Sequence, residues 1–277
     1  MDTLTWNRSS VMKKEINVIK VGGAVVEDAG SLASLLDQFA RIPRYKVLVH
    51  GGGRLATKMA TSLGIESKMV GGRRITDREM LRVVTMVYGG LVNKNIVARL
   101  QAMGVNAIGL TGADMDIIRS HRRPIRQVSM EDGRTETVDF GFVGDVDAAD
   151  GNALSALVKN DIVPVIAPLT HDGQGTILNT NADTMASAVA KALASLYEVT
   201  LTYCFEMPGV MHDPDDRDSV VREITRASYA RLKEDNIVTG GMIPKLDNAF
   251  DAISQGVCRV VITHFNDIAA KNGTTIL

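Results

Sequence analysis

The sequence predicts an α/β protein: an α/β/α sandwich built on a mainly parallel β-sheet, with a β-hairpin flap added to it. Short apolar runs alternate along the chain with longer amphipathic segments, which is the order expected of such a sandwich. The apolar runs are continuous rather than alternating, as in strands that helices cover on both faces. The 277 residues are enough for one large domain or for two lobes.

Six apolar runs have the length and composition of buried strands, and seven amphipathic segments have the spacing of helices. The predicted strands are Ile16–Val21, Lys46–Val49, Asn106–Leu110, Ile162–Ala167, Glu198–Tyr203 and Cys258–Thr263. The predicted helices are Ser31–Ala40, Ala56–Leu63, Arg78–Met103, Asn152–Lys159, Ala182–Ala194, Ser228–Asp235 and Ile243–Gln255.

One region departs from this alternation. Residues 117–143 contain stretches of period two around Asp132-Gly133, a dipeptide that favours a tight hairpin turn. We therefore expect an antiparallel hairpin flap inserted after the strand Asn106–Leu110. Clustered charge usually faces solvent, so the arginines of this region are expected to form a solvated face. They are Arg119, Arg122, Arg123 and Arg126.

Composition and charge are those of an ordinary globular protein. Hydrophobic residues make up 45% of the chain, and a net charge of -1 gives no reason to expect nucleic acid or a membrane as partner. Cys204 and Cys258 lack CxxC spacing and fit reduced thiols of a cytoplasmic protein. No apolar run has the length of a membrane span, and the first residues lack the apolar core of a signal peptide. Because Met12 and the two lysines after it resemble a bacterial start, we leave Met1–Val11 out of the predicted fold.

Glycine clusters follow two of the predicted strands. Gly22 and Gly23 come after the strand that contains Lys20, and Gly51–Gly53 follow the next strand. Glycine is costly in regular structure, so a cluster indicates a place where the backbone must come close to something. Two such turns side by side would gather backbone amides in front of a helix N-terminus, an arrangement suited to a phosphoryl group. Tight βα turns without any function would give the same pattern.

Familiar nucleotide and hydrolase motifs do not explain these loops. The chain has no Gly-Lys dipeptide for a Walker A loop, and Gly51, Gly53 and Ala56 match a Rossmann fingerprint only if its last glycine is relaxed. His50–Gly53 resembles an esterase oxyanion loop, but the chain has no G-x-S-x-G elbow. The histidines also lack metalloprotease spacing. Lys20 adds a positive indication, because a lysine within an apolar strand is costly unless it meets an anion.

Lys20, Gly22, Gly23 and His50–Gly53 resemble the corresponding motifs of the amino acid kinase family. Further motifs continue the resemblance in order from about Ile16 to Leu277, and the set is more specific than any one of them. They are GGRRIT at Gly71–Thr76, VDFGFVGDV at Val138–Val146, ILNTNADTMA at Ile177–Ala186, TGGMIPK at Thr239–Lys245 and the ending GTTI at Gly273–Ile276.

The resemblance implies an open eight-stranded sheet and two lobes. An N-lobe at 12–178 would bind an acyl amino acid and form a dimer contact through the segment 78–103. A C-lobe at 179–277 would bind ATP with Mg²⁺. The implied partners are these small molecules and a second copy of the chain, in a homodimer.

The resemblance also implies a role for each matching residue. Lys20 and Lys245 would stabilise the transferring phosphoryl group, and Asp183 would hold both lysines in place. The residues implied for the acyl substrate are Gly52, Gly53, Arg74 and Asn179, and those implied for the nucleotide are Gly23, Glu206, Gly209 and Thr239. A carboxylate acceptor is already a nucleophile, so positive charge and amide donors suffice without a general base.

Two positions depart from the family pattern. FEMPG at Phe205–Gly209 stands where the family has (S/T)DVxG, and Arg73 stands where a leucine is common. Arg73 could be a chance surface cation, or it could meet a second carboxylate on a larger acyl group such as succinyl. A structural alternative also exists for part of the site, because Asn179 or Asn181 is expected to cap the helix that begins at Ala182.

We therefore expect ATP-dependent phosphorylation of the γ-carboxylate of an N-acyl-L-glutamate, with N-acetyl-L-glutamate as substrate, in arginine biosynthesis. N-succinylglutamate is an alternative substrate, and a carbamate or aspartate kinase is a rival within the family. A non-catalytic arginine or nucleotide sensor is the rival from another class, against which Lys20, Asp183 and Lys245 argue together. In the family that the chain resembles, members inhibited by arginine carry an extra N-terminal helix that links dimers into a hexamer. Met1–Glu15 has no sustained apolar stripe. The resemblance therefore implies a homodimer that arginine inhibits weakly or not at all.

Overall fold

The structure, a computed structural model, describes residues 13–129, 134–213, 215–240, 242–269 and 272–277. Two expectations concern residues outside this set: Met1–Val11 and the hairpin turn at Asp132-Gly133. Within the described residues, no helix is long and apolar enough to cross a membrane.

Strands and helices alternate as the sequence predicts. The strands are β1 (Glu15–Val21), β2 (Tyr45–His50), β3 (Met69–Val70), β4 (Arg73–Arg74), β5 (Ala107–Leu110), β6 (Ile118–Arg122), β7 (Arg126–Ser129), β8 (Thr135–Val138), β9 (Gly144–Ala149), β10 (Val163–Ile166), β11 (Leu169–His171), β12 (Ile177–Asn179), β13 (Glu198–Phe205), β14 (Glu223–Ile224), β15 (Arg259–His264) and β16 (Thr274–Ile276). The helices are α1 (Gly23–Glu27), α2 (Ala29–Arg41), α3 (Gly53–Ser62), α4 (Arg78–Val84), the π-helix η1 (Thr85–Val92), α5 (Asn93–Ala102), the 3₁₀ turn η2 (Asp114–Asp116), α6 (Gly151–Lys159), α7 (Ala182–Ala194), α8 (Arg226–Glu234) and α9 (Met242–Ser254).

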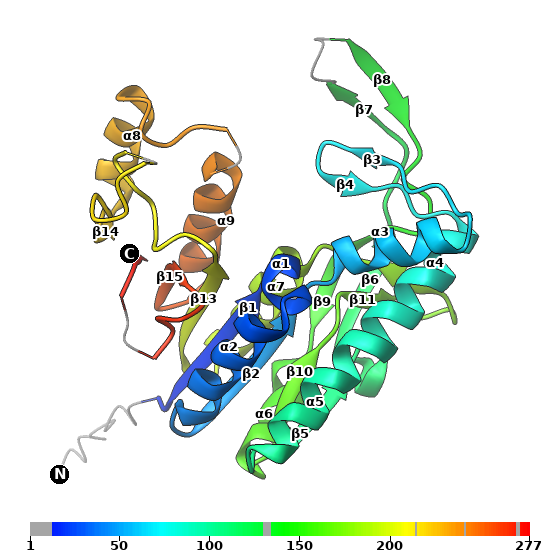
Figure 1. The fold of residues 1–277 in the computed structure, drawn as a ribbon, viewed down its shortest axis with the longest axis horizontal. Helices are drawn as coiled ribbons and strands as arrows, with labels where there is room; N and C mark the ends of the chain where they lie inside the picture. Colours follow the sequence, from blue (N-terminus) through cyan, green and yellow to red (C-terminus); the bar gives the residue numbers. More distant parts are fainter. Residues whose placement is uncertain (1–12, 130–133, 214, 241, 270–271) are drawn as a thin grey trace, which may run out of the picture.

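The main sheet has eight strands in the order β14-β16-β15-β13-β1-β2-β10-β5 (Figure 1). Its neighbouring strands are parallel except for the antiparallel pair β15–β16. All six predicted strands belong to this sheet, so the predicted fold class is confirmed. The proposed lobes at 12–178 and 179–277 stay a prediction, since this one sheet is continuous between them.

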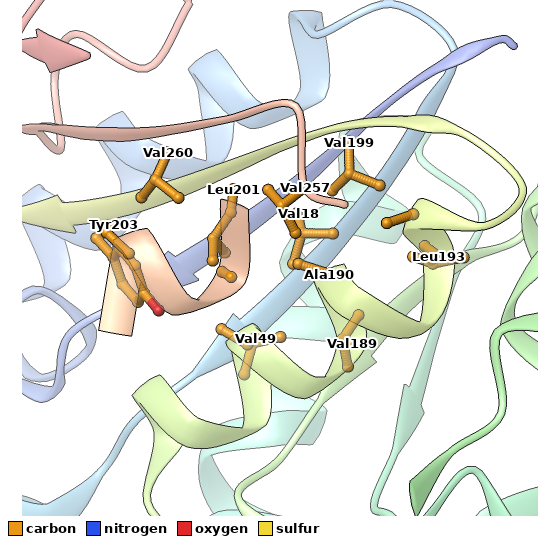
Figure 2. Close-up of a cluster of buried hydrophobic side chains, with 14 of the residues drawn as sticks. Val18, Val49, Val189, Ala190, Leu193, Val199, Leu201, Tyr203, Val257 and Val260 are labelled. Carbon is orange, nitrogen blue, oxygen red and sulfur yellow. The ribbon is translucent and has the colours of Figure 1, made fainter. Parts of the chain in front are cut away.

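Helices cover both faces of the sheet, as continuous apolar strands require. On one face, Val18 and Val49 of the central strands pack with Val189 and Leu193 of α7, as Figure 2 shows. On the other face, Ile19 belongs to a second core formed with α2, α3, α4 and α5. The alternation along β1 places Lys20 on the same face as Val18, which is the face of α7.

The region that departs from the alternation is larger than one hairpin. β7 and β8 pair as the expected antiparallel hairpin, and Figure 1 shows it extending from the molecule beside β3 and β4. The segments on either side of it, β6 and β9, instead belong to a four-stranded sheet of order β12-β11-β6-β9. The expectation of one flap was therefore incomplete. β6 buries Ile118 and Ser120 and exposes its other residues, which is the pattern of a strand packed on the core and not of a free hairpin.

The segment predicted as one helix, Arg78–Met103, is helical to Ala102 but widens at its centre into η1. Gly89 and Gly90 lie in this wide turn. Glycine has a weak preference for the α-helix, so the change from α-helical to π-helical hydrogen bonding costs little here. η1 faces the interior with Val87 and Tyr88 and presents Met86 and Leu91 to solvent.

Candidate active site

The two glycine loops lie side by side, because β1 and β2 are parallel neighbours with Val21 opposite His50. The amide of Gly51 donates to the carbonyl oxygen of Val21 at 3.0 Å. A β-carbon at Gly51 would lie 3.1 Å from the nitrogen of Gly23, so only glycine fits there without displacement. A β-carbon at Gly23 would lie 3.6 Å from the nitrogens of both Gly52 and Gly53. The backbone nitrogens of Gly52 and Gly53 therefore lie close to Gly23, at the N-terminus of α3.

His50 contacts the backbone of the second glycine loop. It is fully buried, and burial lowers its pKa from 6.5 to about 4, so the ring is neutral near pH 7. Its Nδ1 lies 2.8 Å from the carbonyl oxygen of Gly51, and Nδ2 of Asn93 lies 3.1 Å from Nε2. The neutral tautomer that satisfies both contacts donates from Nδ1 and accepts at Nε2. The histidine therefore has a structural partner on each side and is no candidate base.

Lys20 and Asp183 form an ion pair at the point where β1 meets α7. Nζ of Lys20 lies 2.8 Å from Oδ1 of Asp183, and their side chains are 9% and 27% exposed. The contact lacks hydrogen-bond geometry, so it is a purely ionic contact. Asn181 caps α7 by accepting from the amides of Asp183 and Thr184, at 2.9 and 3.1 Å. Asn181 is thus the cap that the sequence left open between two asparagines, and Asp183 is free to face the lysine.

Lys245 reaches the same area from α9. Its ammonium lies 4.1 Å from the centre of the Phe205 ring, and the described residues include no ion pair between it and Asp183. Burial lowers the pKa of Lys245, the nearby Asp183 raises it, and Lys20 lowers it. Lys245 therefore lies within electrostatic reach of both residues. The expectation that Asp183 holds both lysines therefore stays a prediction for Lys245, whose described contact is the ring of Phe205.

A cavity of about 190 Å³ opens beside the glycine loops. Its lining includes the predicted residues Gly23, Gly52, Gly53, Arg74 and Asn179, which the structure therefore brings together. The same cavity is lined by Tyr88 of η1, which the sequence did not indicate.

Arg74 is buried at the wall of this cavity and is held by protein acceptors. Its Nη2 donates to the carbonyl oxygen of Gly53 at 2.8 Å and to Oγ1 of Thr57 at 2.9 Å. Its Nη1 donates to Oγ of Ser67. A bidentate grip on a substrate carboxylate therefore requires some of these hydrogen bonds to exchange. Until then, Arg74 ties strand β4 to the first residue of α3.

Asn179 is the last residue of β12 and lines the same cavity. Its Nδ2 donates to Oγ1 of Thr76 at 2.9 Å, and its backbone amide donates to the carbonyl oxygen of Phe142 at 2.8 Å. Its side-chain carbonyl oxygen remains available to accept a hydrogen bond from a ligand amide. Asn179 and Arg74 thus line the same cavity.

The residues implied for the nucleotide are only partly brought together. Gly23 and Glu206 line a second cavity of about 330 Å³, together with Phe205. Gly209 instead packs on β16, where a β-carbon would lie 2.7 Å from Oγ1 of Thr274. Thr239 is exposed before α9, and its carbonyl oxygen accepts from the amide of Met242 at 3.1 Å. Gly209 and Thr239 thus have structural roles, Gly209 in packing on β16 and Thr239 in accepting a hydrogen bond at the start of α9.

Arg73 interacts electrostatically with two other arginines, Arg123 and Arg126. Arg73 lines the first cavity, and burial together with the charges of these two arginines lowers its pKa. The side chain of Arg123 is only 4% exposed, and its Nε donates to both carboxylate oxygens of Asp145 at 3.1 Å. Nη1 of Arg123 is buried, with no hydrogen-bond partner among the described residues. The expected solvated face is therefore wrong for Arg123, because Asp145 and the ring of Phe140 hold it inside.

The chain is similar in sequence to known proteins. Residues 15–264 match the amino acid kinase family. The chain is 59% identical to an acetylglutamate kinase of Bacteroides thetaiotaomicron over 265 residues, which cover 96% of this chain and 99% of that protein. It is 58% identical over 265 residues to an acetylglutamate kinase of Phocaeicola vulgatus, again with 96% and 99% covered.

A solved structure shows the same architecture. The crystal structure of smu.665 from Streptococcus mutans superposes with a TM-score of 0.74 at 27% identity and covers 94% of this chain and 98% of that one. The family match spans most of the sheet and both glycine loops, and the relatives match nearly from end to end. The chain belongs to the amino acid kinase family.

Proposed function

We propose that this protein transfers the γ-phosphoryl group of ATP to the γ-carboxylate of N-acetyl-L-glutamate, giving the N-acetylglutamyl 5-phosphate, in arginine biosynthesis. The relatives called acetylglutamate kinase support the substrate. The observation that carries the proposal is that Nζ of Lys20 lies 3.9 Å from the position of a β-carbon at Gly22, in the same turn as Gly23. Gly23 in turn lines a cavity together with Gly52, Gly53 and Arg74. This surface offers positive charge and N–H donors where two anions would have to meet.

The chemistry needs alignment more than covalent help. An oxygen of the γ-carboxylate attacks the γ-phosphorus, the bond from phosphorus to the bridging oxygen breaks, and ADP leaves with that electron pair. Repulsion between the anions is the main barrier that the protein can lower, by fixed cations and amides aimed at the oxygens that carry the charge. The acceptor is ionised at neutral pH, so no general base is required, in agreement with a neutral and fully bonded His50.

Each predicted residue has a role in this proposal. Lys20 and Lys245 stabilise the phosphoryl group, and Asp183 positions Lys20. The amides of Gly52 and Gly53, with Arg74 and Asn179, bind the acyl amino acid. Gly23 and Glu206 face the nucleotide, with Gly209 and Thr239 supporting the segments near it.

Mg²⁺ is proposed to accompany ATP. This ion keeps octahedral oxygen coordination and is commonly held through nucleotide phosphates with few protein ligands. Among the residues that the structure describes, no group of three His, Cys, Asp or Glu side chains is placed to hold a metal. The donors present therefore fit an ion that arrives with the phosphates, neutralising part of their charge.

The test of the proposed function is an ADP-release assay with N-acetylglutamate, N-succinylglutamate, aspartate and carbamate as acceptors. Acceptor-dependent ADP release with N-acetylglutamate supports the proposal, and release only with aspartate or carbamate overturns its substrate. A protein that binds ATP but releases no ADP with any acceptor is a sensor instead, the alternative from outside the enzymes.

N-succinylglutamate is the second candidate substrate, and two of these arginines favour it. Arg73 lines the cavity, and the unpartnered Nη1 of the buried Arg123 adds a cation with unused donors nearby. A second carboxylate on the acyl group would meet this charge. If it does, Arg73→Leu should weaken turnover of N-succinylglutamate and leave N-acetylglutamate almost unchanged. Equal effects on the two acceptors would exclude a role for Arg73 in reading the acyl group.

We further propose a cytoplasmic homodimer. Met86 and Leu91 of η1 are 55% and 51% exposed, and Ile108 of the edge strand β5 is 37% exposed. Apolar side chains next to an open sheet edge are suited to cover one another in a second copy of the chain. Reduced Cys204 and Cys258 agree with the cytoplasm.

A further inference from the structure

Phe205, the last residue of β13, lies next to both candidate phosphoryl-binding lysines. The ammonium of Lys245 is 4.1 Å from the centre of its ring, and that of Lys20 is 5.5 Å away. The ring also stacks on Tyr203, with 6.5 Å between ring centres and 21° between planes. Phe205 is half-buried, and its orientation is supported from within the sheet.

The two lysines differ in what else holds them. Lys20 is anchored by its ion pair with Asp183. For Lys245, no hydrogen bond or ion pair of the ammonium is found within the described residues, and its ammonium lies over the ring of Phe205. A lysine side chain carries four rotatable bonds, so an ammonium without a fixed partner would spread over many positions.

We propose that Phe205 is a positioning residue that holds Lys245 in place for phosphoryl transfer through a cation–π contact, a role that rests on the proposed function of Lys245. The negative face of the ring attracts the ammonium, and the attraction is stronger where water is partly excluded. The ring contacts one side of the ammonium only. The N–H groups on the other side remain free to donate to a phosphate oxygen, so the contact restrains the lysine without occupying it.

The geometry can be tested without substrate by NMR of the full chain labelled with carbon-13 at the lysine ε-position. A proton group over an aromatic face is shifted upfield, so we expect one lysine signal shifted strongly and assigned by its loss in Lys245→Arg. The shift should disappear in Phe205→Leu and Phe205→Met, which keep apolar volume without a ring. It should persist in Phe205→Tyr. Phe265→Leu is the matched control, since Phe265 is a half-buried phenylalanine just beyond the neighbouring strand β15.

The same variants separate positioning from packing in kinetics. In Phe205→Leu and Phe205→Met we expect kcat to fall about two- to thirtyfold, the range for one cation–π contact, with the KM for the acyl substrate nearly unchanged. Phe205→Tyr should retain kcat, and Phe265→Leu should stay within about twofold of the parent. Thermal unfolding of each variant identifies any that fail to fold. If one ring-free variant fails, the other is compared with the parent.

Two results would overturn the inference. In the first, the parent shows no upfield-shifted lysine signal, or that signal persists in both ring-free variants. The other is a parental kcat in Phe205→Leu and Phe205→Met despite loss of the shift. Failure of the proposed function is distinguishable, because the parent would then lack activity with every acceptor while the NMR comparison would still report on the contact.

Discussion

Nζ of Lys20 lies 2.8 Å from Oδ1 of Asp183. An ion pair therefore joins the buried strand β1 to the first turn of α7. The pair stands beside the amides of Gly22–Gly23 and of Gly51–Gly53. A phosphoryl group placed there would meet a lysine already desolvated and oriented, which is the condition for strong electrostatic stabilisation.

Removing either lysine should therefore slow the reaction. Lys20→Ala and Lys245→Ala are each expected to lower kcat by roughly a hundredfold or more, the scale for loss of one preorganised electrostatic partner. Asp183→Asn should also lower kcat, because Lys20 loses its anchor. The matched control is Lys159→Ala, at an exposed lysine that ends α6. A near-normal kcat in Lys20→Ala, measured by ADP release, would contradict the assignment.

Arg74→Lys tests whether the paired N–H donors of the guanidinium bind the substrate carboxylate. Lysine keeps the charge but cannot reproduce paired N–H donors, so the KM for the acyl amino acid should rise while that for ATP stays nearly fixed. The expected loss is about 1.5–3 kcal/mol, the range for a hydrogen bond to a charged group. Arg82→Lys, at an exposed arginine of α4, is the control. If only the KM for ATP rose, the substrate would lie elsewhere.

Arg74→Lys should also lower thermal stability. The guanidinium bonds Gly53, Thr57 and Ser67 at once, and a lysine ammonium on a different stem cannot keep all of these contacts. A buried acceptor left without its donor costs about 1–3 kcal/mol. Calorimetry of the free protein would measure this loss, and an unchanged unfolding midpoint would show that the hydrogen bonds contribute no net stability.

Gly23→Ala separates binding from folding. A methyl group there would lie 3.6 Å from the amide nitrogens of Gly52 and Gly53, an ordinary contact that the backbone tolerates. It would nevertheless fill the space beside these amides and keep an anion from reaching them. We expect kcat/KM to fall by about a hundredfold or more with little change in the unfolding midpoint. Gly30→Ala, in the exposed first turn of α2, is the control; comparable activity losses in both variants would contradict a specific role.

Stability should fall in acid because of His50. Burial lowers its folded-state pKa from 6.5 to about 4, so the unfolded chain binds more protons between these values. The contribution is complete above pH 6.5 and is lost as pH falls towards 4, by about 3 kcal/mol. Urea unfolding between pH 4.5 and 7 should therefore show a steeper loss in the parent than in His50→Gln. Equal slopes would mean that His50 does not titrate in this way.

The dimer contact can be tested at η1. Leu91→Glu places a charge on the exposed apolar face, and burial of an unpaired charge between two copies would be costly. Sedimentation should show a dimer for the parent and a monomer for this variant. Glu66→Gln changes charge at an exposed position away from η1 and should remain dimeric. A monomeric parent, or a dimer that tolerates Leu91→Glu, would exclude this surface.

The sequence by itself determined six strands of the main sheet, seven helical segments and the fold class. Ile16–Val21 and Lys46–Val49 are recognisable because buried strands need unbroken apolar runs, and the glycines after them indicate turns whatever surrounds them. The order of the motifs likewise depends on the chain alone. These features are local, so neighbouring residues suffice to predict them.

Tertiary structure decided which side chains meet. Nothing near Arg123 in the sequence indicates that Asp145 and Phe140 bury it, and composition alone predicted an exposed face. The sequence also did not indicate that the ring of Phe205 lies against Lys245, because the start of α9 and the end of β13 are brought together only by the packing of the folded chain. The second sheet and η1 also depend on such packing. Contacts between distant segments are stabilised by burial and charge that exist only after folding, and for this reason local patterns do not predict them.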